Sequence, residues 1–300
     1  MEFSLGQWQP VADRVWVAVA EPASVNIGLV VGDRAVLVVD TGSSPEQGAM
    51  IAASAAEHAG RPVTHVVVTH DHFDHFWGLA GFGSEVVSIA HESAHLPTGD
   101  GREVPDGPGE PTPAVPEGLA AATTTVAMVK AIDLGGARAE IIHHGRGHTQ
   151  GDLVVHLPER DVVFTGDLVE VGAEPSFGPD STVETWAATL DGMLGATLDS
   201  TRFVPGHGSV VDKQVVFEQR ANVSTIYGQA EQLVGRGIRL DQALEALDTP
   251  EIDGRPHPGA SQWDWPYSAR TIRTALPLAY AELAAKGLEP RTSLPLLGRL

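Results

Sequence analysis

Residues 69–75 read Thr69-His70-Asp71-His72-Phe73-Asp74-His75 and directly follow the apolar run of residues 66–68. Their imidazoles and carboxylates offer only nitrogen and oxygen donors, a set that suits Zn²⁺ and also accepts Fe or Mn. His70 and His72 are two residues apart and can both face one ion, while Asp74 and His75 can face a second. The stretch therefore predicts metal ligands at the end of a buried strand.

Further polar residues lie at or just beyond the ends of other apolar runs, namely Asp40, His148, Asp167 and His207. Strand ends that share a sheet edge present their loops to one rim, so we expect these side chains to converge on residues 69–75. His148 can complete the first ion's ligands, His207 can complete those of the second, and the carboxylate of Asp167 can bridge the two. Two ions about 3.5–4 Å apart can hold a shared hydroxide and lower its pKa toward neutrality.

Short apolar runs separated by turns predict strands in the first two thirds of the chain. The runs cover residues 15–19, 25–31, 35–39, 63–69, 85–90, 139–144, 152–157, 161–165 and 203–204. A helix is predicted from Ser44, as N-cap, to Gly60, and another over residues 181–194 with Ser181 and Glu184 as a capping box. Because each half has strands followed by a helix, we expect an α/β fold with two sheets between layers of helices.

The remaining residues predict a helical extension, residues 211–300, packed on a catalytic domain of residues 1–210. Helices are expected over about 212–236, 240–248 and 268–286, and Pro277 should kink or split the last of them. We interpret the extension as a lid or a dimer arm, which makes a homodimer one expected assembly. Residues 97–116, rich in Pro, Gly and acidic residues, predict a mobile surface loop.

Two histidines and three aromatic residues near these motifs are not predicted to bind metal. His91 and His95 are interpreted as surface histidines. Phe73 and Phe76 are expected to line the substrate pocket, whereas Trp77 fits either the pocket or the core.

The arrangement of motifs resembles that of the metallo-β-lactamase superfamily. The motifs that carry the resemblance are residues 70–75 for HxHxDH, residues 147–152, Thr165-Gly166-Asp167 and Gly206-His207-Gly208, which follow the family's order. Residues 38–42 also resemble the family's opening motif. The resemblance covers roughly residues 12 to 210 and implies an αββα metallo-β-lactamase sandwich with the site at one edge.

The resemblance also implies a ligand for each position of a two-metal centre. The first ion would be held by His70, His72 and His148, the second by Asp74, His75 and His207, with Asp167 bridging. Asp40 would orient a ligand. We predict Asp74 and Asp167 as the catalytic residues and two Zn²⁺ per chain as the cofactors, with Fe or Mn as alternatives.

The amino-acid composition limits the kinds of molecule that the protein can bind. Nineteen Lys and Arg against 39 Asp and Glu give a formal charge of −20, which repels phosphate backbones and anionic lipid. We therefore expect a small-molecule substrate, with no nucleic-acid or membrane partner. The absence of cysteine excludes thiolate ligands and Cys nucleophiles. No apolar run is long enough to span a bilayer and the N-terminus lacks a signal-peptide pattern, so we expect a cytoplasmic protein.

These observations predict a dinuclear metal-dependent hydrolase whose bridging hydroxide attacks an ester, thioester or lactone of a small molecule. The family's di-iron oxygen-reducing branch carries Glu at the position of His72, which favours hydrolysis over redox chemistry here. Residues 147–152 look like the glyoxalase II and lactonase side of the family, although no basic glutathione-binding cluster can be matched. The alternatives are a β-lactamase-like amide hydrolase and a nucleic-acid-processing or non-catalytic member of the same fold.

Overall fold

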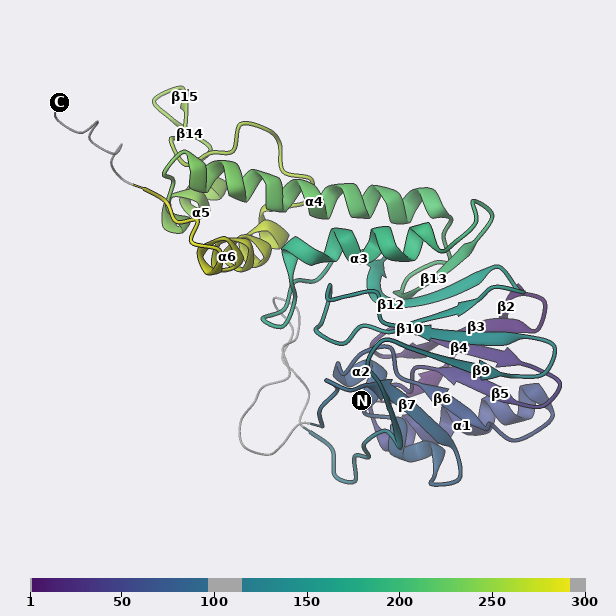
Figure 1. Ribbon diagram of the computed structural model, residues 1–300. Coiled ribbons are helices and arrows are strands. Elements are labelled where there is room, and N and C mark those ends of the chain that lie inside the picture. Colours follow the sequence, from purple (N-terminus) through teal and green to yellow (C-terminus); the bar gives the residue numbers. More distant parts are fainter. Residues whose placement is uncertain (1, 97–114, 292–300) are drawn as a thin grey trace.

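Most of the apolar runs form strands that are buried on both faces. All residues of β5 (Val36–Val39) and β11 (Val154–Leu157) are buried, as are the first six of β4 (Val25–Val31). A strand can be apolar at every position where both faces are covered. The computed structural model describes residues 2–96 and 115–291 and accordingly places helices on both outer sides of the strands (Figure 1).

The strands form two half-sheets that hydrogen bonds join into one 13-stranded sheet. The first half contains β1 (Ser4–Leu5), β2 (Gln9–Ala12), β3 (Val15–Glu21), β4, β5, β6 (His65–Val67), β7 (Val87–His91) and β8 (Thr124–Val126). The second contains β9 (Val129–Asp133), β10 (Arg138–Ile142), β11, β12 (Val162–Glu170) and β13 (Arg202–His207). The halves meet where Val25 of β4 pairs with His207 of β13.

The helices are α1 (Pro45–Ala59), α2 (Phe73–Phe76), the 3₁₀ helix η1 (Leu79–Phe82), α3 (Val183–Gly195), α4 (Lys213–Gly235), α5 (Leu240–Asp248) and α6 (Ala269–Ala285). A small hairpin, β14 (Glu251–Ile252) and β15 (Arg255–Pro256), lies between the last two. The first helix begins and ends as predicted, because Ser44 accepts a hydrogen bond from the Gln47 N–H and Gly60 adopts the left-handed conformation.

The fold has four layers, in which the two half-sheets lie between an outer layer of helices on each side. Three clusters of apolar side chains fill the spaces between these layers. In β5, Val36 and Val38 pack toward Ile51 of α1, whereas Leu37 and Val39 pack toward the second half-sheet. The outer face of the second half-sheet packs against α3, α4 and α6. In Figure 1, α3 and α4 accordingly lie on one outer side of the strands and α1 on the opposite side. The predicted αββα sandwich is confirmed, with its two sheets hydrogen-bonded at one seam.

The structure differs from the prediction at the start of α3, and it excludes one of the two outcomes predicted for Pro277. The capping box does not form: α3 begins at Val183, and the first N–H groups of the helix donate to the carboxylate of Glu282 from α6 instead. Pro277 does not split α6, which is continuous because Ile272, Leu276 and its other apolar residues are buried against α3 and α4. Residues 97–114 of the predicted loop lie outside the described residues. Within the described part of the chain, no helix is long and apolar enough to cross a membrane.

Candidate metal centre

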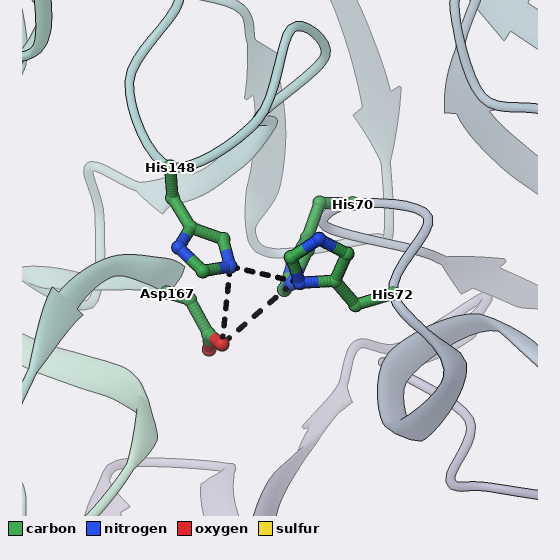
Figure 2. A group of neighbouring side chains, drawn as sticks. All are labelled: His70, His72, His148 and Asp167. Atoms are coloured by element: carbon green, nitrogen blue, oxygen red, sulfur yellow. Dashed lines mark hydrogen bonds and ion pairs between the residues drawn. The ribbon is translucent and has the colours of Figure 1, made fainter. Parts of the chain in front are cut away.

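The strand ends bring the predicted ligands to one edge of the sheets. His70 and His72 follow β6, His148 lies between β10 and β11, and Asp167 lies within β12. Donor atoms of these four buried residues all lie within 4.8 Å of one another (Figure 2). His148 Nε2 is 2.9 Å from His72 Nδ1 and 3.5 Å from Asp167 Oδ2, and His70 Nε2 is 3.7 Å from the same oxygen. The first predicted ligand set is therefore assembled together with the carboxylate that is predicted to bridge the two ions.

A second group lies beside the first and joins Asp74 and His75 of α2 with His207 of β13. His207 Nε2 is 3.3 Å from Asp74 Oδ2 and 3.4 Å from His75 Nε2. Asp167 contacts this group as well, because its Oδ1 is 3.3 Å from His75 Nε2 and its Oδ2 is 3.6 Å from His207 Nε2. All seven predicted ligands thus converge, and Asp167 is the residue that the two groups share.

The donor atoms fit divalent ions. Tetrahedral ligands with bonds of about 2.0–2.1 Å lie about 3.3–3.4 Å apart. Most of the separations given above fall between 3.3 and 3.7 Å. Two buried donor atoms, His70 Nε2 and Asp167 Oδ1, make no hydrogen bond to the described residues. A buried polar atom without a partner is costly, and a bound cation would satisfy both.

Asp40 fixes the orientation of one histidine. The residue follows β5 with a positive φ of 66°, and its carboxylate accepts hydrogen bonds from Thr69 N–H (2.7 Å) and Thr69 Oγ1–H (3.0 Å). Its Oδ2 is also 2.8 Å from His75 Nδ1. A proton held on Nδ1 leaves Nε2 of His75 free to face the site. Asp40 therefore has the orienting position that the resemblance implied.

The loop between β12 and α3, residues 171–182, orients His72 and His148, two ligands of the first group. Asp180 Oδ2 is 3.3 Å from His72 Nε2, and the Ser176 carbonyl accepts a hydrogen bond from His148 Nδ1–H (3.2 Å). Ser181, predicted to cap α3, instead donates to the carbonyl of His148 (2.6 Å). These contacts could not be predicted from the sequence, because they join segments far apart in the chain and no local pattern indicates them.

Close approach of two strands requires glycine beside the shared carboxylate. A Cβ on Gly206 would lie 1.7 Å from Asp167 Oδ1, and a Cβ on Gly166 would lie 2.6 Å from Thr69 Oγ1. Gly166 also has a positive φ of 51°, which glycine adopts without strain. The glycines next to the ligands are therefore part of how the site is built.

Burial lowers the pKa values of the histidines, whereas neighbouring carboxylates raise them. Burial lowers the pKa of His148 to about 4 and holds the pKa of His70 well below its usual value. Burial acts in the same direction on His72 and His207, but Asp180 raises the pKa of His72 to about 9 and Asp167 raises that of His207 to about 12. At neutral pH the metal-free site therefore combines neutral imidazoles with charged ones.

Glu170, the last residue of β12, lies at the site although it belongs to none of the motifs described above. One of its carboxylate oxygens lies within 4.8 Å of donor atoms of Asp167 and His207. Burial and the charge of Asp167 raise the pKa of Glu170 to about 7. The strand was predicted to end at Thr165, whereas it continues to Glu170 and brings this side chain beside the seam.

Some neighbouring side chains lie elsewhere than predicted. His91 is buried, not on the surface, and its ring lies 4.3 Å from that of His143, between centroids. Phe76 and Trp77 are buried in the apolar layer between α1 and the first half-sheet, so Phe76 does not line a pocket. His95 is exposed, as predicted.

Comparisons with known proteins agree with this geometry. A sequence model described as "Metallo-beta-lactamase superfamily" matches residues 20–207, which is more than half of the chain. The chain is 29% identical over 203 residues to "2,4-dinitroanisole O-demethylase subunit alpha" of Nocardioides sp. (strain JS1661), covering 66% of this chain and 56% of that protein. It is also 29% identical over 220 residues to "Acyl-coenzyme A thioesterase MBLAC2" of Homo sapiens, covering 66% of this chain and 77% of that one.

A solved structure supports the same fold. The chain resembles "Metallo-beta-lactamase from Pontibacter korlensis" with a TM-score of 0.60 and 18% sequence identity, covering 74% of this chain and 99% of that one. At this identity the likeness concerns the fold alone. With the family match, the confirmed sandwich and the converging histidines and carboxylates, the chain belongs to the metallo-beta-lactamase superfamily.

Proposed function

We propose that this chain is a dinuclear metal-dependent hydrolase that acts on an ester, thioester or lactone of a small molecule, with two Zn²⁺ as its ions. The observation that carries the proposal is the carboxylate of Asp167, which lies between two groups of three donors each. Two divalent ions, when bound, would polarise a substrate carbonyl and lower the pKa of water toward neutrality.

The residues of the chain itself would hold and orient this centre. Asp74 and Asp167, the predicted catalytic residues, would act by holding the ions at a fixed separation. Asp40 and Asp180 would keep the rings of His75 and His72 turned toward the site. Six of the seven ligands are buried and the side chain of His207 is 20% exposed, which keeps the electrostatic interactions of the site strong.

A thioester is the first substrate class to test. The match to the relative named an acyl-coenzyme A thioesterase covers 77% of that relative's length. The predicted absence of nucleic-acid and membrane partners, the cytoplasmic location and the homodimer remain predictions. Binding to structured RNA that weakens with added salt would instead favour the nucleic-acid-processing alternative.

The test combines metal analysis with a substrate panel of acyl-CoA thioesters, aryl esters, lactones and β-lactams. The purified protein should bind about two ions per chain and hydrolyse a member of the panel. His70→Ala should lose hydrolysis while keeping its circular dichroism spectrum, because only one buried donor is removed. His65→Ala, a change on the strand that leads to the site, should keep both properties. Hydrolysis by His70→Ala at the wild-type rate would contradict the proposed centre.

A further inference from the structure

Glu170 places a third carboxylate beside the second group of donors. It lies opposite His207 in the parallel pairing of β12 and β13, three residues beyond Asp167. One oxygen of each carboxylate and one nitrogen of His207 lie within 4.8 Å of one another. Ligands on opposite sides of one ion, with bonds of about 2.1–2.2 Å, are about 4.2–4.4 Å apart. The 4.8 Å limit exceeds this separation by about 0.4 Å, so a small adjustment of the side chains would let the three share an ion.

The backbone and the neighbouring loop hold Glu170 in this position. Its N–H donates to Gln219 Oε1 of α4 (3.0 Å), and its Oε2 accepts a hydrogen bond from Ser176 N–H (3.1 Å). An ionised carboxylate has about four acceptor positions, so one hydrogen bond leaves room for a cation. Asp167 supplies a further indication that a cation binds here, because its buried Oδ1 makes no hydrogen bond to the residues described and lies 3.3 Å from His75 Nε2.

We infer that Glu170 belongs to the second ion's site and makes that site richer in oxygen donors than the first. The inference rests on the proposed dinuclear centre. The second site would then offer Asp74, Asp167 and Glu170 with the two imidazoles of His75 and His207. The first offers three imidazoles and the shared carboxylate.

The consequence is a difference in metal preference between the two sites. Imidazole suits Zn²⁺, whereas carboxylate oxygen suits harder ions such as Mn²⁺. The second site therefore discriminates less strongly against Mn²⁺ than the first. In a mixture of the two metals, the protein takes Zn²⁺ first into the histidine-rich site and accepts Mn²⁺ beside it.

The experiment equilibrates the metal-free 300-residue protein with Zn²⁺ and Mn²⁺ in a metal buffer. Elemental analysis and the electron paramagnetic resonance signal of Mn²⁺ then report which metals are bound. Wild type should pass through a range with about one ion of each. Glu170→Gln, which keeps the side-chain volume, should bind Mn²⁺ about 10- to 100-fold more weakly. Glu282→Gln removes a carboxylate that accepts N–H groups of α3 and should behave as wild type.

The outcomes separate this inference from the proposed function. A wild-type protein that binds fewer than two ions contradicts the dinuclear centre itself. A wild-type protein that binds two ions, with unchanged Mn²⁺ affinity in Glu170→Gln, overturns only the role of Glu170. Circular dichroism checks folding, and if Glu170→Gln is unfolded, Glu170→Asp is measured instead, since it keeps the charge and withdraws the carboxylate. Weaker Mn²⁺ binding by Glu170→Asp supports the inference, and wild-type affinity overturns it.

Discussion

Gly206→Ala is expected to disable the metal centre without unfolding the protein. The added Cβ would lie 1.7 Å from Asp167 Oδ1. An ordinary contact between carbon and oxygen is about 3.3 Å, so the carboxylate would have to move by about 1.6 Å. Metal ligands tolerate displacements of only about 0.2 Å. Asp167 would therefore be lost to both groups of donors at once.

Gly206→Ala should affect metal affinity more strongly than the free energy of unfolding. Loss of the shared carboxylate should weaken metal binding by about 100-fold or more, which corresponds to about 2.7 kcal/mol. The free energy of unfolding of the metal-free protein should change by less, about 1–2 kcal/mol, because the severe contact is with the carboxylate of Asp167, whereas the backbone carbon of Gly166 lies 3.0 Å from the added Cβ. Competition with a chelator of known affinity measures the first quantity, and urea unfolding followed by circular dichroism measures the second.

Gly228→Ala provides the matched control. This glycine lies within α4, and a Cβ there meets no atom within 4 Å. Alanine is favoured over glycine in a helix by up to about 1 kcal/mol, so this variant should be slightly more stable and bind metal as wild type does. If Gly206→Ala bound two ions with wild-type affinity, the close packing of Gly206 against Asp167 would not be what positions the shared carboxylate.

Three further predictions concern the groups around the ligands. Asp40→Asn should weaken binding of the second ion about 10- to 100-fold in a chelator competition, because His75 loses its carboxylate partner; unchanged affinity would contradict this role. In the metal-free protein the pKa of His72 is raised to about 9, that of His207 to about 12 and that of His75 well above its usual value, so all three carry a proton at pH 7 that an ion must displace. Metal affinity should therefore rise with pH between 6 and 8, and calorimetry in buffers of different ionisation enthalpy should detect about three protons released; zero release would refute it. Glu174→Gln should cost about 1 kcal/mol of unfolding free energy in urea, because the carboxylate accepts three hydrogen bonds at the start of α6; unchanged stability would show that this cap contributes nothing.

Features governed by neighbouring residues could be predicted from the sequence. The bounds of α1 follow from Ser44 and Gly60, which act on N–H and carbonyl groups only a few residues away. The convergence of the seven ligands could also be predicted, since polar residues at the ends of buried strands meet at a sheet edge.

Contacts between distant segments could not be predicted in the same way. The carboxylate of Glu282 replaced the predicted capping box of α3, although 98 residues separate it from Glu184. Glu170 reached the site because β12 continues past a bulge near Gly166, which no apolar pattern marks. His91 is buried because His143 packs against it from another strand end. Each of these outcomes depends on which segments the fold brings together.

The seam between the half-sheets gives the ions a second role. His70, His72, Asp74 and His75 follow a strand of one half, whereas His148, Asp167 and His207 belong to the other. Ions held there would cross-link distant parts of the chain and bind only its folded form, so a metal-free molecule would unfold more readily. Since a change of 1–2 kcal/mol can alter a protein's steady-state level several-fold through proteolysis, metal supply would set how much of this protein a cell retains.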